Sequence, residues 1–206
     1  SNSLLPNAPV VDIECGTDGS IWVATYHGLL RKRNVNWDSF DLTNGLVDTL
    51  LRKVKEMNGK IYVGSTIGGI SVFENNGWSH FNTSNSNLEG NQIRFFEESP
   101  NSTIWAGSFW HFYAIENGIW SVLDNSNTGI SDPRVNDMAI PSDNELHFAT
   151  HVGYSILKNG EWSGFTILNS PLPHNIVEMV EVDAKGNAWI GTFGGLAIYN
   201  QNGIDL

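Results

Sequence analysis

The chain has few basic residues and a single cysteine among its 206 residues. Lys and Arg number 11 against 22 Asp and Glu, which gives a formal net charge of -11 at pH 7. Phosphate backbones and anionic membrane surfaces need a basic patch, so this balance excludes nucleic acid as a partner and disfavours membrane surfaces. Cys15 cannot form an internal disulfide, and we interpret it as a small buried residue near the end of a strand.

The sequence also lacks a long apolar run, a metal-binding motif and sustained helical periodicity. No stretch is long and apolar enough to cross a membrane, and the given residues contain no signal peptide, although a processed leader would precede residue 1. The six histidines form no His-x-x-x-His pattern. We therefore expect no membrane insertion, no metal, no cofactor and no assignable catalytic residue. The absence of helical periodicity favours an all-β fold.

One sequence unit recurs five times along the chain. An aromatic residue or histidine marks each copy at steps of 40 to 43 residues, and Gly or Ala lies two positions after it. A later Trp column recurs at steps of 41, 42 and 42. Repeats of this length with a periodic aromatic residue are typical of β-propeller blades. The marker column is Trp22, Tyr62, Trp105, His147 and Trp189, and the later column is Trp37, Trp78, Trp120 and Trp162.

Turn signals divide each unit into four strands, a to d. Asn and Gly supply the positive φ angles that two-residue hairpins need. We expect one series of such pairs to join strands a and b, and a second series to join strands c and d. The first series is Asp18-Gly19, Asn58-Gly59 and Lys185-Gly186, and the second is Asn76-Gly77, Asn117-Gly118, Asn159-Gly160 and Asn202-Gly203.

These columns predict an all-β fold: a five-bladed β-propeller of four-stranded antiparallel blades, with strand d of the last blade shortened. All-β chains of this length are commonly one domain, so we expect a single domain over residues 1–206. We expect the five blades to close on themselves. The alternative is a five-unit piece of a longer propeller, which would expose two apolar blade faces. The expected blades span about 8–41, 48–82, 91–124, 133–166 and 175–206.

Several segments resemble two-component regulator propeller repeats. They are residues 21–29, residues 188–196 and the linker 85–88, and the resemblance extends over essentially the whole chain. In that family the repeats build extracytoplasmic propellers, many of them sensor regions of bacterial membrane histidine kinases that respond to glycans. The resemblance implies a bacterial recognition module in the periplasm or outside the cell, and the repeat motif brings no catalytic residue with it. A weaker similarity is to the propeller of streptogramin lyases.

The candidate binding surface is the face on which b–c turns and interblade linkers emerge from four-stranded blades. The b–c turns differ from unit to unit, and variation within a repeated scaffold is typical of a binding surface. Unit three departs most, because Phe109-Trp110-His111 stands where the other units have a turn that ends in Gly. We interpret this run as a stacking platform for sugar rings or other planar ligands. The alternative is that Trp110 packs over a neighbouring blade.

Other residues on the predicted face complete the candidate ligand site. Aromatic side chains on turns add stacking surface, and histidines add hydrogen-bonding groups. Arg134, beside Pro133, is a candidate for a bidentate contact with an anionic group. His147, in the marker column, is instead expected to be a hydrogen-bonded core residue. The candidate ligand-binding residues are Tyr26, His27, Phe109, Trp110, His111, Arg134, His151, His174 and Phe193.

A second set of charged residues falls in or beside the innermost strands, which line the central channel of a propeller. We expect these side chains to pair with each other and to solvate a water-filled channel rather than to catalyse a reaction. The candidate channel-lining residues are Asp12, Arg52, Arg94, Asp137 and Glu178.

Three functional classes remain open. The leading class is an extracytoplasmic binding propeller for an oligosaccharide or another small molecule. The second is a lyase-type enzyme, which requires a histidine on the binding face within hydrogen-bond reach of a carboxylate. The third is a scaffold for a protein partner. An exposed Trp110 beside a concavity would favour binding, and a histidine–carboxylate pair on that face would favour an enzyme.

Overall fold

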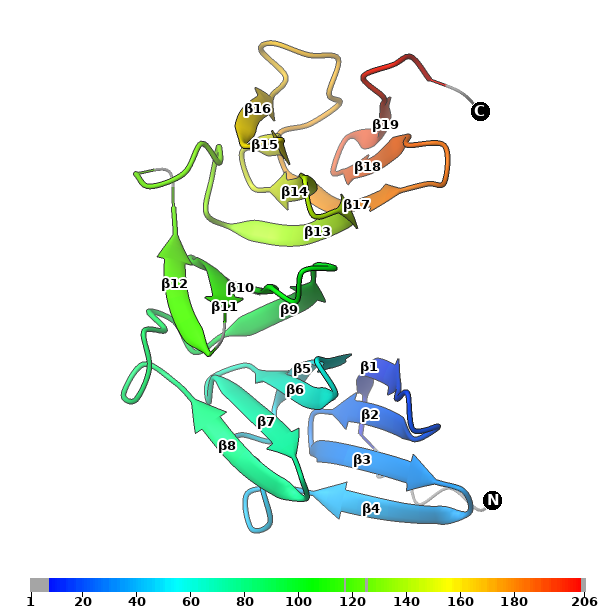
Figure 1. The fold of residues 1–206 in the computed structure, drawn as a ribbon, viewed down its shortest axis with the longest axis vertical. Helices are drawn as coiled ribbons and strands as arrows, with labels where there is room; N and C mark the ends of the chain where they lie inside the picture. The colour runs from blue at the N-terminus through cyan, green and yellow to red at the C-terminus, as the bar shows by residue number, and fades with distance from the viewer. Residues whose placement is uncertain (1–7, 117, 125, 205–206) are drawn as a thin grey trace. The chain divides into compact units, whose positions relative to one another are not determined.

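The computed structural model describes residues 8–116, 118–124 and 126–204 (Figure 1). Within these ranges the chain forms 19 strands in five antiparallel sheets and no helix. Neighbouring strands in each sheet follow chain order, so every connection inside a sheet is a hairpin. No helix of the described chain has the length and apolar character needed to span a bilayer. The predicted antiparallel units are therefore confirmed.

The strands fall into the five sheets in chain order. The first sheet comprises β1 (Val10–Cys15), β2 (Ile21–Thr25), β3 (Gly28–Arg33) and β4 (Asn36–Phe40). The second comprises β5 (Leu51–Met57), β6 (Lys60–Ser65), β7 (Ile70–Glu74) and β8 (Gly77–Phe81), and the third β9 (Ile93–Glu98), β10 (Ile104–Ser108), β11 (Phe112–Glu116) and β12 (Ile119–Leu123). The fourth comprises β13 (Val135–Ser142), β14 (Glu145–Thr150), β15 (Gly153–Lys158) and β16 (Glu161–Phe165), and the fifth β17 (Val177–Val182), β18 (Ala188–Thr192) and β19 (Gly195–Tyr199).

The fifth sheet has three strands within the described residues. Ile204, the position to which the Trp column projects, lies outside any strand. The expected end of the last blade at residue 206 lies outside the described residues. β19 is therefore the outer strand of this sheet, whereas β3, β7, β11 and β15 each pair with a fourth strand.

Two details of the sequence interpretation are corrected. The hairpin between β7 and β8 turns at Asn75 and Asn76, with φ of 51° and 60°, one residue earlier than the predicted Asn76-Gly77 pair. Cys15 ends β1 and is exposed rather than buried. Of the predicted Asn117-Gly118 turn, Asn117 lies outside the described residues, while Gly118 has a φ of 78°. The other hairpin glycines of the two predicted series have positive φ.

Contacts divide the chain into two compact units, residues 1–96 and residues 97–206, with the boundary inside β9. In unit 1, β5 packs against β1 and β2, and a core cluster that includes Trp22, Leu29 and Leu51 is buried between the first two sheets. In unit 2, β17 packs against β13 and β14, and Tyr154 and Ile190 belong to the corresponding cluster. The single domain and the closure of the five blades remain predictions.

The linkers between sheets are ordered by a repeated asparagine. Asn127 accepts a hydrogen bond from the Asp124 backbone N–H (2.9 Å) and donates one to the Val122 carbonyl (2.9 Å). The same pair of bonds recurs at the three other linkers. Three residues after Asn127, Ile130 is buried in the linker. These bonds hold the chain as it leaves one sheet and enters the next. The four asparagines are Asn44, Asn85, Asn127 and Asn169.

Candidate functional site

In unit 2 the b–c turns meet the linkers through backbone hydrogen bonds. The His151 N–H donates to the Arg134 carbonyl (3.2 Å), and the Gly153 N–H donates to the Asn175 carbonyl (2.7 Å). At the fifth sheet, the Phe193 N–H donates to the carbonyl of the residue before Val177 (3.1 Å). The same contacts recur in unit 1, where residues 26, 28, 66 and 69 donate to linker carbonyls. Turns and linkers thus form one surface within each unit, as the sequence predicts.

A hydroxyl column shapes every b–c turn. The last residue of strand b is Ser or Thr in every sheet. Its hydroxyl donates a hydrogen bond of 2.8 to 3.0 Å to a backbone carbonyl, either that of the first residue of strand c or that of the residue before it. The same oxygen accepts a backbone N–H from inside the turn. The Ser or Thr stands three residues after the marker in every unit, so the pattern is visible in the sequence, but its role in the turn is not. The five residues are Thr25, Ser65, Ser108, Thr150 and Thr192.

The turn of the third sheet takes a different path because His111 replaces the glycine. Gly28 and Gly153 have φ of 119° and 107°, and a Cβ on Gly153 would lie 2.2 Å from the Phe165 carbonyl oxygen. His111 is not among the residues with positive φ. Its turn leaves the two preceding aromatic side chains at the surface, with Trp110 58% exposed and Phe109 36% exposed.

Four of the predicted ligand-binding residues come together here. The Phe109 and Trp110 rings meet edge to face, with centroids 4.7 Å apart and an interplanar angle of 73°. The His151 ring lies 6.2 Å from Phe109, also edge to face. The Arg134 guanidinium carbon lies 5.7 Å from the centroid of the Trp110 ring. We call these four residues, with the two polar partners described next, the Trp110 cluster.

Two polar residues that the sequence interpretation missed hold this cluster in place. Asp132 accepts bonds from Arg134 Nε (2.8 Å) and Nη2 (2.6 Å), and this pairing raises the pKa of the guanidinium above its usual range. Asn136 Oδ1 bonds His151 Nε2 (3.1 Å), and its amide donates to the Val177 carbonyl (2.8 Å). The spacing Asp-Pro-Arg was the available signal for the first pair. Because Asp132 already binds the fork of Arg134, an external anion would have to displace it.

Comparisons with known proteins identify the fold. No family model and no curated protein sequence matches the chain. Among solved structures, the chain is similar to one described as the extracellular domain of the hybrid two-component system BT3049 from B. thetaiotaomicron. The sequence identity is 20% and the TM-score is 0.80, and the match covers 96% of this chain and 29% of that one. The chain is also similar to virginiamycin B lyase from Staphylococcus aureus (18% identity, TM-score 0.73, 98% and 70% covered). A third similar structure is the WD40 β-propeller domain of Doa1 (14% identity, TM-score 0.65, 93% and 64% covered).

The fold is a five-bladed β-propeller. The neighbours bear out the suspected resemblance to two-component sensor propellers, and the weaker one to lyase propellers, at the level of fold. The chain spans less than a third of the length of the first of these neighbours.

The remaining predicted ligand-binding residues of the propeller are not members of the Trp110 cluster. Tyr26 (43% exposed) and His27 lie on the b–c turn of blade one, in unit 1. On blade five, the Phe193 ring is exposed and lies 5.9 Å from that of His174, whose Nδ1 accepts the backbone N–H of residue 176 (2.9 Å). His111 is half-buried, with its ring 6.3 Å from that of Tyr113.

Two of the predicted channel residues of the propeller bind the inner strand of the next blade. Asp12 accepts the Val54 N–H (2.9 Å) and forms an ion pair with Lys53 (3.3 Å). Asp137 occupies the same register position in blade four and accepts the Val180 N–H (3.0 Å). Burial raises the pKa of Asp137 to about 6, against the effect of the Val180 bond. The other three candidates are placed as follows: Arg52 and Glu178 are exposed, and Arg94 is half-buried.

The marker histidine is a core residue. His147 is buried, its Nδ1 bonds the Tyr154 hydroxyl, and its Nε2 bonds Glu145 Oε1 (3.0 Å). Burial lowers the pKa of His147 and outweighs the attraction of Glu145, so the ring is neutral near pH 7. In this histidine–carboxylate pair His147 is buried in blade four and Glu145 begins β14, at the end of the strand opposite the b–c turn. Within the described residues, no group of three or more His, Cys, Asp or Glu side chains is arranged to hold a metal ion.

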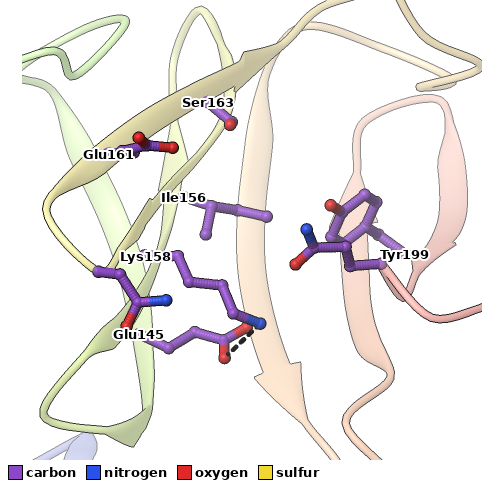
Figure 2. A pocket seen from close by; sticks show the side chains of 8 residues that line it. Glu145, Ile156, Lys158, Glu161, Ser163 and Tyr199 are labelled. Carbon is purple, nitrogen blue, oxygen red and sulfur yellow. Dashed lines mark ion pairs between the residues drawn. The ribbon is translucent and has the colours of Figure 1, made fainter.

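Unit 2 of the propeller also contains pockets away from the Trp110 cluster. An apolar one of about 260 Å³ lies beside β19, and a polar one of about 240 Å³ is lined by acidic residues of β9 and β17. A third, of about 170 Å³, lies between blades four and five at the end opposite the b–c turns (Figure 2). None of the predicted ligand-binding residues lines these three pockets. The residues of the third pocket are Glu145, Ile156, Lys158, Asn159, Glu161, Ser163, Tyr199 and Gln201.

Proposed function

We propose that the propeller is an extracytoplasmic recognition module that binds a neutral glycan at the Trp110 cluster. The observation that carries this proposal is the exposed Trp110 ring, held between Phe109 and Arg134 at a turn that departs from the repeat. Aromatic faces bind the apolar faces of sugar rings, and neighbouring polar groups bind the hydroxyls. The propeller supplies both kinds of group within this one cluster.

The electrostatics of the cluster favour an uncharged ligand. The Arg134 fork is occupied by Asp132, so the pair adds no net charge and presents hydrogen-bonding edges to a hydroxyl group. The Asn136 side chain orients the His151 ring from the linker side. The whole chain carries a net charge of -11, which repels anionic glycans at low salt. A neutral, hydroxylated ring satisfies all three features.

The cellular location and the sensing role follow from likeness alone and belong to the same proposal. One similar structure is described as the extracellular domain of a two-component system, so a periplasmic or extracellular location is the natural assignment. An enzymatic role is less favoured, because the ring of the face histidine His151 is oriented by the amide of Asn136, which cannot serve as a general base. A protein partner at the same surface is the other outcome of the test below.

Replacing Trp110 by Ala is expected to weaken glycan binding by at least about tenfold, because the stacking surface is removed. The melting temperature should change by no more than about 2 °C, since an exposed ring contributes little to folding. Binding is measured on an array of neutral and anionic glycans, with hits confirmed by calorimetry. Ile119→Ala is the matched control, because Ile119 is an exposed apolar residue of the same blade on β12. Unchanged binding with a lower melting temperature would assign Trp110 to packing.

A further inference from the structure

Unit 1 contains a guanidinium group held by aromatic rings and a carboxylate. Arg31 of β3 lies opposite Trp22 of β2 and Asp38 of β4. Its Cζ is 5.0 Å from the Trp22 ring centroid, 5.4 Å from that of Phe40 and 5.2 Å from that of Phe73. Its Nη2 and Nε bond Asp38 Oδ2 at 2.8 and 2.9 Å, and the side chain is buried. The space between blades one and two is thus built around a cation.

Ile156 of β15 occupies the Arg31 position in blade four. It lies opposite His147 of β14 and Ser163 of β16, as Arg31 lies opposite its tryptophan and aspartate. Isoleucine is shorter than arginine and carries no charge. The pocket of about 170 Å³ between blades four and five is lined by Ile156 and Ser163, so it corresponds to the space that the Arg31 side chain fills in unit 1.

One aromatic residue lines this pocket, Tyr199, and Phe165 packs against it from outside the lining. By strand register, Tyr199 of β19 corresponds to Phe73, and Phe165 of β16 corresponds to Phe40. The Phe165 and Tyr199 centroids are 5.0 Å apart, and those of Phe40 and Phe73 are 5.8 Å apart. Figure 2 shows Tyr199 on the opposite side of the pocket from the residues of blade four. A planar cation in this pocket would therefore lie beside an aromatic side chain, as the Arg31 guanidinium lies beside Phe73 in unit 1.

The carboxylates of the pocket come from positions other than that of Asp38. Glu145 pairs with Lys158 (2.9 Å), and the bonds from Lys158 and His147 hold the pKa of Glu145 below its usual range despite burial, so it is ionised. The Glu161 carboxylate makes no hydrogen bond or ion pair within the part of the chain that the structure describes, and Figure 2 shows it beside the pocket. The two glutamates and one lysine leave a net negative charge.

Lys158 does not prevent a second cation from binding. Its counterpart by register is Arg33, which shares Asp38 with Arg31 at 3.1 Å in unit 1. Blade one therefore shows that two cationic side chains can lie beside one carboxylate at these positions of the repeat. In blade four, Lys158 forms an ion pair with Glu145, so Glu161 is the carboxylate that can bind a second cation.

We propose that the pocket between blades four and five binds a guanidinium group, with its flat face against Tyr199 and its N–H groups directed at Glu161. The group is carried either by a small guanidino compound or by an arginine side chain of a peptide. The site is separate from the Trp110 cluster and does not depend on glycan binding. Its specificity is for a planar cation, because a neutral group of the same shape gains nothing from Glu161.

The test is a titration of the whole 206-residue chain with low-millimolar methylguanidinium, followed by NMR. Methylurea serves as the neutral control of similar shape. We expect saturable binding of methylguanidinium with shifts at Tyr199, and no binding of methylurea. Glu161→Gln should weaken binding at least about tenfold, whereas Glu116→Gln, the same charge change at an exposed site in blade three, should leave it unchanged. Equal binding by all three proteins, or of both compounds, overturns the proposal.

A double variant tests the repeat argument itself. Ile156→Arg with Ser163→Asp recreates the Arg31–Asp38 pair inside the pocket, so the chain's own guanidinium should abolish methylguanidinium binding and raise the melting temperature. Glu161→Gln keeps the test decisive if the double variant does not fold, because Glu161 is exposed. Acetyl-Gly-Arg-Gly-amide distinguishes the two sources. Binding at least about tenfold tighter than methylguanidinium assigns the site to a peptide arginine, and equal binding assigns it to a small molecule.

Discussion

Replacing Gly153 by Ala is expected to lower the free energy of unfolding by about 3 to 5 kcal/mol. Gly153 begins β15 with a φ of 107°, where L-residues are strained, and its missing Cβ would lie 2.2 Å from the Phe165 carbonyl oxygen. That oxygen is backbone in the strand pair β15–β16, so it cannot move without disturbing the blade. Urea denaturation followed by circular dichroism measures the loss.

Gly195→Ala is the matched control, because Gly195 holds the same repeat position in blade five. Its φ is 130°, but no atom lies within 4 Å of a Cβ built there, since the fifth sheet has no fourth strand among the described residues. We expect a loss of about 1 to 2 kcal/mol from backbone strain alone. Equal losses in the two variants would show that the fourth strand does not create the requirement for glycine.

The change in free energy of unfolding caused by Asp137→Asn is expected to be about 2 kcal/mol more favourable at pH 7.5 than at pH 4.5. Burial, with the nearby charges of Glu97 and Glu181, raises the pKa of Asp137 to about 6 from an ordinary value of 3.8. The folded protein thus retains a proton that the unfolded chain releases between these values. The contribution of Asp137 is most favourable below about pH 4 and is lost as the pH rises through 6. Asparagine keeps the acceptor for Val180 without the charge.

Asp12→Asn provides the comparison for this prediction. Asp12 has the same register position and bonds the backbone of the next blade, but it also pairs with Lys53, so the substitution removes an ion pair. We expect a loss of no more than about 1 kcal/mol from this half-exposed pair. Unfolding of both variants is followed across pH 4.5 to 7.5. If the difference in free energy of unfolding between Asp137→Asn and the wild type does not change with pH, the account is contradicted.

The strands were predictable because the repeat places the same chemistry at the same step. The Asn and Gly pairs provide positive φ wherever two strands must reverse, and the marker segment returns in every unit. The error at Asn75-Asn76 arises because two consecutive asparagines can both adopt positive φ, so the pair with glycine was not required. Cys15 was assigned to the interior from its residue type, yet it ends an inner strand at the open edge of its sheet.

The candidate sites were predictable only where a residue breaks the repeat. His111 in place of glycine pointed to the altered turn of blade three, and the structure places the adjacent Phe109 and Trp110 at the surface. The partner of Arg134, Asp132, lies two residues before it and was open to inference from that spacing, whereas the orientation of His151 by Asn136 depends on side-chain geometry that no spacing encodes. The guanidinium pocket requires strand register, because only the pairing shows that Ile156 stands where unit 1 has an arginine.

The indole N–H signals of the eight tryptophans test the central claim most directly. Trp189 and Trp105 donate these groups to Asp183 and Ser99, and Trp22 and Trp120 are buried, whereas Trp110 is 58% exposed. The strongest neutral glycan from the array is titrated into 15N-labelled protein, with Trp110→Phe used to assign its signal. The account predicts that the Trp110 indole signal shifts and the buried ones do not. Shifts confined to other tryptophans, or an array without a neutral glycan hit, would contradict it.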